Sequence, residues 1–281
     1  MGTLFVVGTP IGNLEDLTLR AARVLRTVDV VVAEDAQRAR KLLGHVGCNP
    51  KVITYREDSP ESREDAVIER LRGGDVALIV DAGTPGVSDP GPDLLARVRA
   101  EGLPIVPIPG PSALTTALSV VSFARQPVAF LAFLPERRVR RERLVRRAAD
   151  TARTLVIYLP PHGAAERLAE LEAWLGDVPA ALCRELTKLH EEILESTLAD
   201  IANHVAVVGA RGELTVVVDV GGVTESPEVD RATVEEQLRS HLEAGIRPAK
   251  AAGAVARALE LPRDDVYRIA RELREPPRGS A

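Results

Sequence analysis

One stretch of this sequence decides the fold class: VALIVDAGTPGVSDPG, residues 76–91. Its first part, Val76–Val80, is a continuous apolar run of the kind that forms a buried parallel strand. Its second part, Asp81–Gly91, is rich in glycine and proline and precedes a segment with helical spacing, Leu94–Val98. The stretch therefore predicts a long loop at the carboxyl end of a strand, where open α/β sheets bind ligands. A wide turn that only caps a helix is the alternative, but a plain connection needs only about 2–6 residues.

Strand and helix patterns alternate outward from this stretch through the first half of the chain. Short apolar runs predict strands, and the amphipathic segments between them predict helices. This alternation predicts an α/β domain with a doubly wound parallel sheet. The expected strands are Leu4–Val7, Val28–Ala33, Lys51–Thr54, Val76–Val80 and Pro104–Pro107, and the expected helices are Thr18–Arg26, Gln37–Val46, Arg63–Arg72 and Pro92–Ala100.

The second half predicts another α/β domain, with a mixed sheet and no repeat of the first half. Pro107–Pro111 breaks the alternation, and Ser112 is expected to cap a helix over Ala113–Ser119. We expect Glu191–Thr197 and Leu214–Val220 to be neighbouring strands. The other expected strands are Val128–Phe133, Thr154–Tyr158 and Ala180–Arg184, and the expected helices are Arg138–Asp150, Ala164–Leu175 and Leu198–Val205.

The last part of the chain predicts a small helical module that begins near Glu225, after which Ser226-Pro227-Glu228 forms a linker. Three short helices are expected over Val234–Ala244, Pro248–Leu259 and Arg263–Leu273, a pattern similar to a helix-turn-helix module. Its charge is close to balanced, so nucleic-acid binding and a packing or dimer role both stay open. The predicted domains are thus residues 1–111, 112–224 and 225–281.

Composition is typical of a soluble globular protein, with 45% apolar and 27% charged residues. The net charge of −5 gives no whole-chain attraction to nucleic acid or to an anionic membrane. No apolar run reaches the length of a membrane span, and the chain begins directly with a strand pattern, so we predict a cytoplasmic protein. Cys48 and Cys183 lack metal-ligand spacing and are expected to be buried apolar residues.

Polar motifs follow the expected strands at the same sheet edge as the Asp81–Gly91 loop. Gly8–Asn13 has two glycines without the spacing of a phosphate-binding loop, and we expect it to form one wall of a cleft. Glu34 and Asp35 end the second strand and either cap the next helix or act on a substrate. Lys188 lies in a charged segment, Cys183–Glu192, that a solvated sheet edge would also explain.

Arg137–Arg147 is the one strong positive cluster in this acidic chain. On a helix its arginines would spread around much of the circumference. Arginine contacts to phosphates hold a nucleic acid independently of its sequence. We therefore predict nucleic-acid binding by this segment, with a solvated helix face as the alternative.

Taken in order, these motifs resemble the ribosomal RNA small subunit methyltransferase I family of the tetrapyrrole methylase superfamily. The resemblance implies a two-domain fold with S-adenosylmethionine in the cleft, 2′-O-methylation of cytidine 1402 in the 16S rRNA of the 30S subunit, and a homodimer. It implies no metal. The segments that carry it, from about Leu4 to Gly221, are Thr9–Leu14, Ala33–Asp35, Asp81–Gly86, Pro107–Ala113, Phe133–Pro135, Arg184–Lys188 and Gly212-Glu213.

A ribose hydroxyl is weakly acidic, so a general base would help its reaction; Glu34 and Asp35 are the first candidates, and Lys188 is the third. The resemblance also implies a substrate side and cofactor contacts. The substrate side would include Pro10, Asn13, Arg38, Arg137, Arg138, Arg140 and Arg141. On that side Ala36–Ala39 departs from the family's usual Thr-Arg-His-Thr. The cofactor would contact Asp81, Gly83, Val87, Ser88, Ser112, Ala113, Leu159, Leu186, Gly212 and Glu213.

Two other functions stay open at this level. A tetrapyrrole C-methyltransferase would keep the fold and pair the arginines with substrate carboxylates, and uroporphyrinogen would then replace 30S subunits as the acceptor. A non-enzymatic ribosome- or nucleic-acid-binding factor would use the arginine helix and the terminal helices beside a degenerate cleft. Failure to bind S-adenosylmethionine in calorimetry would favour that factor.

Overall fold

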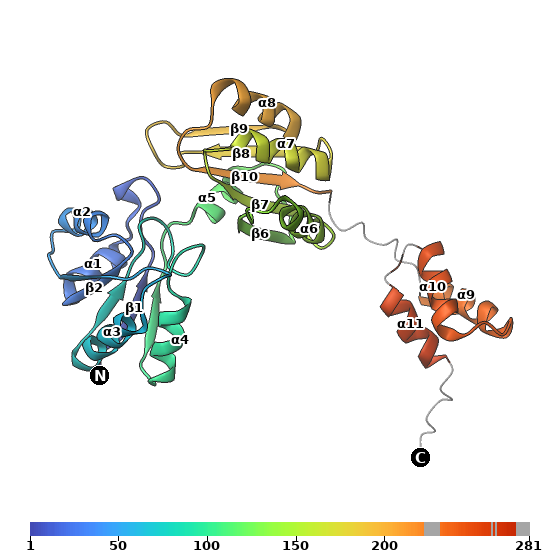
Figure 1. The fold of residues 1–281 in the computed structure, drawn as a ribbon, viewed down its shortest axis with the longest axis horizontal. Coiled ribbons are helices and arrows are strands. Elements are labelled where there is room, and N and C mark those ends of the chain that lie inside the picture. The colour runs from blue at the N-terminus through green and yellow to red at the C-terminus, as the bar shows by residue number, and fades with distance from the viewer. Residues whose placement is uncertain (222–230, 260, 262, 274–281) are drawn as a thin grey trace, which may run out of the picture. The chain divides into compact units, whose positions relative to one another are not determined.

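The structure is a computed structural model that describes residues 1–221, 231–259, 261 and 263–273. Contacts divide the chain into two compact units, Met1–Gly221 and Gly222–Ala281. The first unit holds two five-stranded sheets (Figure 1). The division of this unit at residue 111 stays a prediction, and the boundary predicted at residue 224 and the linker Ser226–Glu228 lie outside the described residues.

The first sheet is parallel throughout and has the strand order β3-β2-β4-β1-β5. α1 and α2 pack on one face and α3 and α4 on the other, so apolar side chains fill both faces. This confirms the predicted doubly wound sheet. The strands are β1 (Leu4–Val7), β2 (Val30–Ala33), β3 (Lys51–Thr54), β4 (Val76–Leu78) and β5 (Ile105–Ile108), and the helices are α1 (Leu19–Thr27), α2 (Ala36–Val46), α3 (Glu61–Gly73) and α4 (Pro92–Ala100).

The second sheet is mixed, as predicted, with the order β6-β7-β10-β8-β9. β6 runs parallel to β7, and every other pair is antiparallel. α6, α7 and α8 cover one face, and α5 packs on the other. The strands are β6 (Val128–Phe133), β7 (Thr154–Leu159), β8 (Pro179–Arg184), β9 (Glu192–Thr197) and β10 (Leu214–Asp219), and the helices are α5 (Ala113–Val120), α6 (Arg138–Ala149), α7 (Ala164–Leu175) and α8 (Leu198–Val208).

The predicted pairing of Glu191–Thr197 with Leu214–Val220 is wrong. β8 lies between β9 and β10 and pairs with both. The chain leaves β8 at Arg184 and folds straight back as β9, which therefore pairs antiparallel with β8 at the sheet edge. The burial patterns agree, because β10 is buried almost throughout whereas alternate residues of β9 are exposed.

Two smaller expectations also fail. Ser112 precedes α5 but its side chain makes no capping hydrogen bond. The backbone N–H of Leu114 instead donates to the hydroxyl of Tyr158 at 3.1 Å, so β7 supplies the acceptor. Cys183 is buried as expected, whereas Cys48 is only half-buried.

The second unit consists of α9 (Arg231–Glu243), α10 (Pro248–Ala258) and α11 (Arg263–Glu272), as the sequence predicted. Val234, Leu238, Val255 and Val266 form its core together with small alanines of α10. In the described part of the chain, no helix has both the length and the apolar character needed to cross a membrane.

A close backbone crossing links the end of β1 to the segment that follows β5. A Cβ atom at position 110 would lie 2.7 Å from the carbonyl oxygen of Gly8, which is closer than real Cβ contacts. Both positions therefore require glycine for steric reasons. The crossing holds the Gly8–Asn13 loop against the turn that leads into α5.

We expect Gly110→Ala to lower the free energy of unfolding by about 1–3 kcal/mol, the usual cost of overpacking. Gly44→Ala is the matched control, because Gly44 lies in α2 and a Cβ atom added there would have nothing within 4 Å. This control should raise stability by up to about 1 kcal/mol, since alanine is the better helix former. Urea unfolding of both variants is the measurement, and equal changes would contradict the steric account.

Candidate active site

The two loops that follow β1 and β4 are joined where the first sheet reverses its winding direction. β1 and β4 are neighbours, yet the chain leaves β1 toward β2 and leaves β4 toward β5, on opposite sides. The N–H of Thr9 donates to the carbonyl of Gly83 at 2.8 Å, and the N–H of Gly83 donates back at 3.2 Å. Open α/β sheets bind ligands at such a switch point.

Thr9 fixes this junction with its side chain as well. Its hydroxyl lies 3.1 Å from the carbonyl oxygen of Val80 and 3.2 Å from that of Gly83. Thr9 is only 1% exposed, so these hydrogen bonds are shielded from water. The Asp81–Gly91 loop therefore leaves the sheet in one fixed direction.

A cavity of about 390 Å³, here called the first cavity, lies beside this junction, and its volume is within the range of small-molecule sites. Its wall carries four carboxylates and one arginine. The remaining lining is mainly apolar and aromatic. The lining residues are Ile11, Glu34, Arg38, Asp81, Ala82, Gly83, Thr84, Val87, Ser88, Asp89, Ser112, Ala113, Phe133, Tyr158, Leu159, Pro160, Pro161, Glu213, Leu214 and Thr215.

Eight of the ten predicted cofactor contacts lie on this wall: Asp81, Gly83, Val87, Ser88, Ser112, Ala113, Leu159 and Glu213. Leu186 does not, because it is buried in the apolar cluster on the α5 face of the second sheet. Gly212 does not either; it has a φ of +75° and packs against the side chain of Glu185. Ser88 has a φ of +64°, a strained conformation for a residue with a side chain, at the cavity wall.

The carboxylates of the first cavity perturb one another. Burial, followed by the charges of Glu34, Asp81 and Glu213, raises the pKa of Asp89 to about 7. Arg38 lies 3.2 Å from Asp81 and neutralises that group. Asp89 lies in the loop that the sequence predicted to bind a ligand, but the sequence pattern assigned it no role of its own, because its burial depends on segments distant in the sequence.

Two of the three candidate bases lie in surroundings that do not favour proton uptake, and their role stays a prediction. Asp35 accepts hydrogen bonds from the N–H groups of Gln37 and Arg38 as the cap of α2. The bonds from Arg38 and then Gln37 lower its pKa, which weakens it as a base. Burial opposes the charge of Lys188, but its contacts with Glu185 and Glu213 outweigh burial and raise its pKa, so it stays protonated.

Glu34 is the candidate base that remains. It lines the first cavity, and burial followed by the charge of Asp81 raises its pKa. A raised pKa brings a carboxylate nearer to the value that suits a general base at neutral pH.

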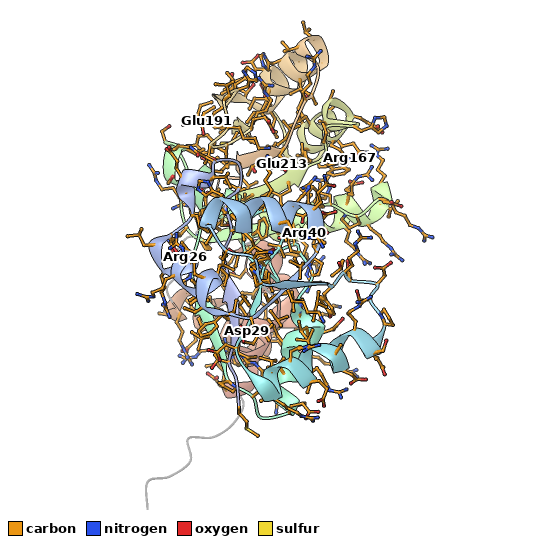
Figure 2. All side chains as sticks on the ribbon, turned by 90° about the vertical axis from the view of Figure 1, so that its left-hand side faces the viewer. Arg26, Asp29, Arg40, Arg167, Glu191 and Glu213 are labelled. Carbon is orange, nitrogen blue, oxygen red and sulfur yellow. The ribbon has the colours of Figure 1, made fainter. Side chains whose placement is uncertain are left out.

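A second cavity of about 300 Å³ adjoins the first, and the two share Ile11, Arg38, Asp81, Ala82 and Glu213. Pro10 and Arg38, two predicted substrate contacts, line it. Asn13 lines neither cavity; its side chain caps the short 3-10 helix Leu14–Asp16 through the N–H of Glu15. The other lining residues are Thr9, Gly12, Leu14, Lys41, Leu42 and Lys188. Figure 2 labels Glu213, at the start of β10, and Arg40, on α2.

The arginine segment divides into an exposed and a buried part. Arg137, Arg138 and Arg140 are exposed near the start of α6. Arg141 is 3% exposed and forms two hydrogen bonds with Glu170 of α7, at 2.8 and 2.9 Å. It also donates to the carbonyls of Pro135 and Glu136. The prediction that Arg141 contacts substrate is therefore wrong, because this side chain anchors α6 to α7.

Comparison with known proteins identifies the class. The model of the tetrapyrrole (corrin/porphyrin) methylases matches residues 3–202. Among solved structures, the cobalt precorrin-4 methyltransferase CbiF aligns with a TM-score of 0.59 at 19% identity, covering 77% of this chain and 94% of that one. Diphthine synthase aligns with a TM-score of 0.60 at 16% identity, covering 78% and 90%. At these identities the two structures show the fold alone.

Sequence relatives narrow the assignment. The ribosomal RNA small subunit methyltransferase I of Halalkalibacterium halodurans is 34% identical over 95% of this chain and 94% of its own length. That of Pseudomonas aeruginosa is 40% identical over 85% of each chain. The chain thus belongs to the ribosomal RNA small subunit methyltransferase I family, within the tetrapyrrole methylases. This confirms the resemblance, and with it a methyltransferase that uses S-adenosylmethionine, in place of a non-enzymatic factor.

The first cavity suits this methyl donor. S-adenosylmethionine carries a sulfonium and an ammonium group, and four carboxylates against one arginine favour a cation. Glycine backbone at Gly83 and the start of α5 at Ala113 offer polar main-chain groups on the same wall.

We expect binding of S-adenosylmethionine to take a proton from Asp89. With a pKa near 7, Asp89 is mostly protonated at pH 6, and a bound cation favours its ionised form. Affinity should therefore rise by about tenfold between pH 6 and pH 8. Asp89→Asn should abolish that rise. Calorimetry in buffers of different protonation enthalpy measures both the affinity and the number of protons released. The same pH dependence of affinity in the wild-type protein and in Asp89→Asn would contradict the role of Asp89.

Proposed function

We propose that this protein transfers the methyl group of S-adenosylmethionine to the ribose 2′-hydroxyl of a cytidine, position 1402, in the 16S rRNA of the 30S ribosomal subunit. One observation carries the proposal: an acidic cavity at the switch point of the first sheet adjoins a second cavity with three cationic side chains. Relatives that span nearly the whole chain bear a name that gives the small-subunit rRNA as their substrate.

The chemistry asks mainly for alignment. S-adenosylmethionine supplies a methyl carbon that is already activated by a sulfonium leaving group. The ribose oxygen forms a bond to this carbon while the carbon–sulfur bond breaks and leaves its electron pair on sulfur. Positioning of the two reactants can contribute about 7–11 kcal/mol. The Thr9–Gly83 pairing supports such positioning because it fixes the walls of both cavities.

Glu34 accepts the hydroxyl proton in this proposal. Its side chain is half-buried at the wall of the first cavity, and its raised pKa favours proton uptake. Arg38 and Arg56 lie close enough to stabilise its charged form before the reaction.

We expect Glu34→Gln to lower kcat by about 10²–10⁴-fold, the usual contribution of a general base. The acid limb of the rate profile, in which activity rises as Glu34 ionises, should disappear. Because Glu34 also attracts the sulfonium of S-adenosylmethionine, kcat is measured at saturating cofactor, and calorimetry checks that each variant is saturated. A variant that keeps the acid limb would assign the proton transfer to another group.

The exposed arginines Arg137, Arg138 and Arg140 hold RNA phosphates in this proposal. Arg137 and Arg140 form no ion pair among the described residues, so their charges are free to pair with phosphates. Such contacts add affinity without base specificity.

We expect Arg137→Glu combined with Arg140→Glu to weaken binding to 30S subunits and to reduce its salt dependence. The slope of the logarithm of the binding constant against the logarithm of the salt concentration should become shallower by about 0.7–0.9 for each phosphate that the variant no longer neutralises. Arg20→Glu combined with Arg23→Glu, two exposed positions on α1, makes the same charge change elsewhere and is the control. Filter binding at several salt concentrations decides, and equal losses in both double variants would refute a specific contact.

A cytoplasmic homodimer completes the proposal. The α5 face of the second sheet supports self-association, because Leu114, Leu118, Phe123 and Phe130 are only partly covered there. Sedimentation velocity on the intact chain distinguishes dimer from monomer.

The test of the function is transfer of tritium from labelled S-adenosylmethionine to purified 30S subunits lacking the modification. We expect one label per subunit, at a linkage that resists alkaline cleavage because its 2′-oxygen is methylated. Label on a base, or label on uroporphyrinogen but none on 30S subunits, would overturn the proposal.

A further inference from the structure

The two adjoining cavities prefer ligands of opposite charge. The first has Glu34 and Asp89 in addition to the shared Asp81, Glu213 and Arg38. The second lacks those two acids and adds Lys41 and Lys188 to the shared groups. A cation is therefore favoured on one side of the shared wall and an anion on the other.

Lys188 is a fixed part of the second cavity. Its Nζ lies 2.8 Å from Oε1 of Glu185 and 3.3 Å from Oε2 of Glu213. A Cβ atom at position 12 would collide with Cγ of Lys188, so the Gly8–Asn13 loop meets this side chain closely only because residue 12 is glycine. The loop and Lys188 are thus packed against each other at the cavity.

Lys41 is the unpaired cation of the second cavity. Arg38 is occupied by Asp81 at 3.2 Å, and Lys188 by two glutamates. Lys41 follows Arg38 by three residues on α2, which puts both on one helix face, and it forms no ion pair with the described residues. An incoming anion would meet this charge without displacing an existing partner.

The rest of the second cavity is apolar. Pro10, Leu14 and Leu42 line it together with Ile11 of the shared wall. A free phosphate ion would gain nothing from these side chains, whereas the flat face of a nucleobase would pack against them. The combination fits a nucleotide better than a simple anion.

We propose that the second cavity receives the target nucleotide, turned out of the RNA, with its phosphate at Lys41 and its ribose hydroxyl at the wall shared with the first cavity. This inference rests on the proposed function and adds the site of the acceptor. Enzymes that modify a base within a duplex extrude the nucleotide in this way. The hydroxyl oxygen attacks the methyl carbon directly, at the place where the two cavities adjoin. Sulfur keeps the electron pair of the broken bond, and the proton goes to a carboxylate of the first cavity.

Lys41→Glu and Arg40→Glu provide a matched test. Both residues are exposed cations on α2, but only Lys41 lines the cavity (Figure 2 labels Arg40). Cytidine 5′-monophosphate is the probe, titrated by NMR into the full chain with S-adenosylhomocysteine bound. We expect Lys41→Glu to weaken its affinity by about tenfold, the value of one charged hydrogen bond, and Arg40→Glu to change it less than about twofold. S-adenosylhomocysteine affinity should be unchanged in both.

Kinetics with 30S subunits give a second readout, in which Lys41→Glu should raise KM more than it lowers kcat. Equal effects of the two variants on nucleotide affinity would overturn the inference, as would inorganic phosphate binding as tightly as the nucleotide. If wild-type protein methylates 30S subunits while the two variants behave alike, only the nucleotide cavity is refuted. If wild-type protein methylates no RNA, the proposed function fails and the titration still decides the cavity.

Discussion

The pairing of Thr9 with Gly83 is the constraint on which the rest of the site depends. The loops that follow β1 and β4 lead to opposite sides of the sheet. Without a link between them, the ligand-contacting residues of one loop would move independently of those of the other. Two backbone hydrogen bonds and a buried hydroxyl tie them at one point. The crossing of Gly8 with Gly110 then adds the turn before α5 to the same rigid group. Three segments distant in sequence thereby hold one cavity wall, which lowers the ordering cost of ligand binding.

Much of the fold follows from local sequence. Apolar runs such as Val30–Ala33 and Leu214–Asp219 specify buried strands, and helices such as Pro92–Ala100 begin and end at the predicted residues. Strand order is harder to predict from the sequence, because it depends on the path that the chain takes between two strands. The apolar pattern of β9 and β10 says that both are strands but not that β8 separates them.

The site was predictable where main chain determines it and less so where side chains find distant partners. The Asp81–Gly91 loop had to lie at a sheet edge, because it follows a buried strand. Arg141 was misassigned because its partner Glu170 lies 29 residues further along the chain and no local pattern links them. Asp35 and Glu34 are adjacent in sequence, yet one caps a helix and the other lines a cavity. The two roles differ because successive side chains of an extended segment point to opposite sides.

Charge around the first cavity also bears on how the proposed reaction ends. Arg38 neutralises Asp81 and Lys188 pairs with Glu213, whereas Glu34 and Asp89 form no ion pair among the described residues. These two groups attract a sulfonium ligand. When no cation is present, burial, followed by the charge of Glu34, raises the pKa of Asp89. Methyl transfer converts the sulfonium to a neutral thioether. The same carboxylates then hold the product less tightly than the donor, so the electrostatics that favour binding also favour release.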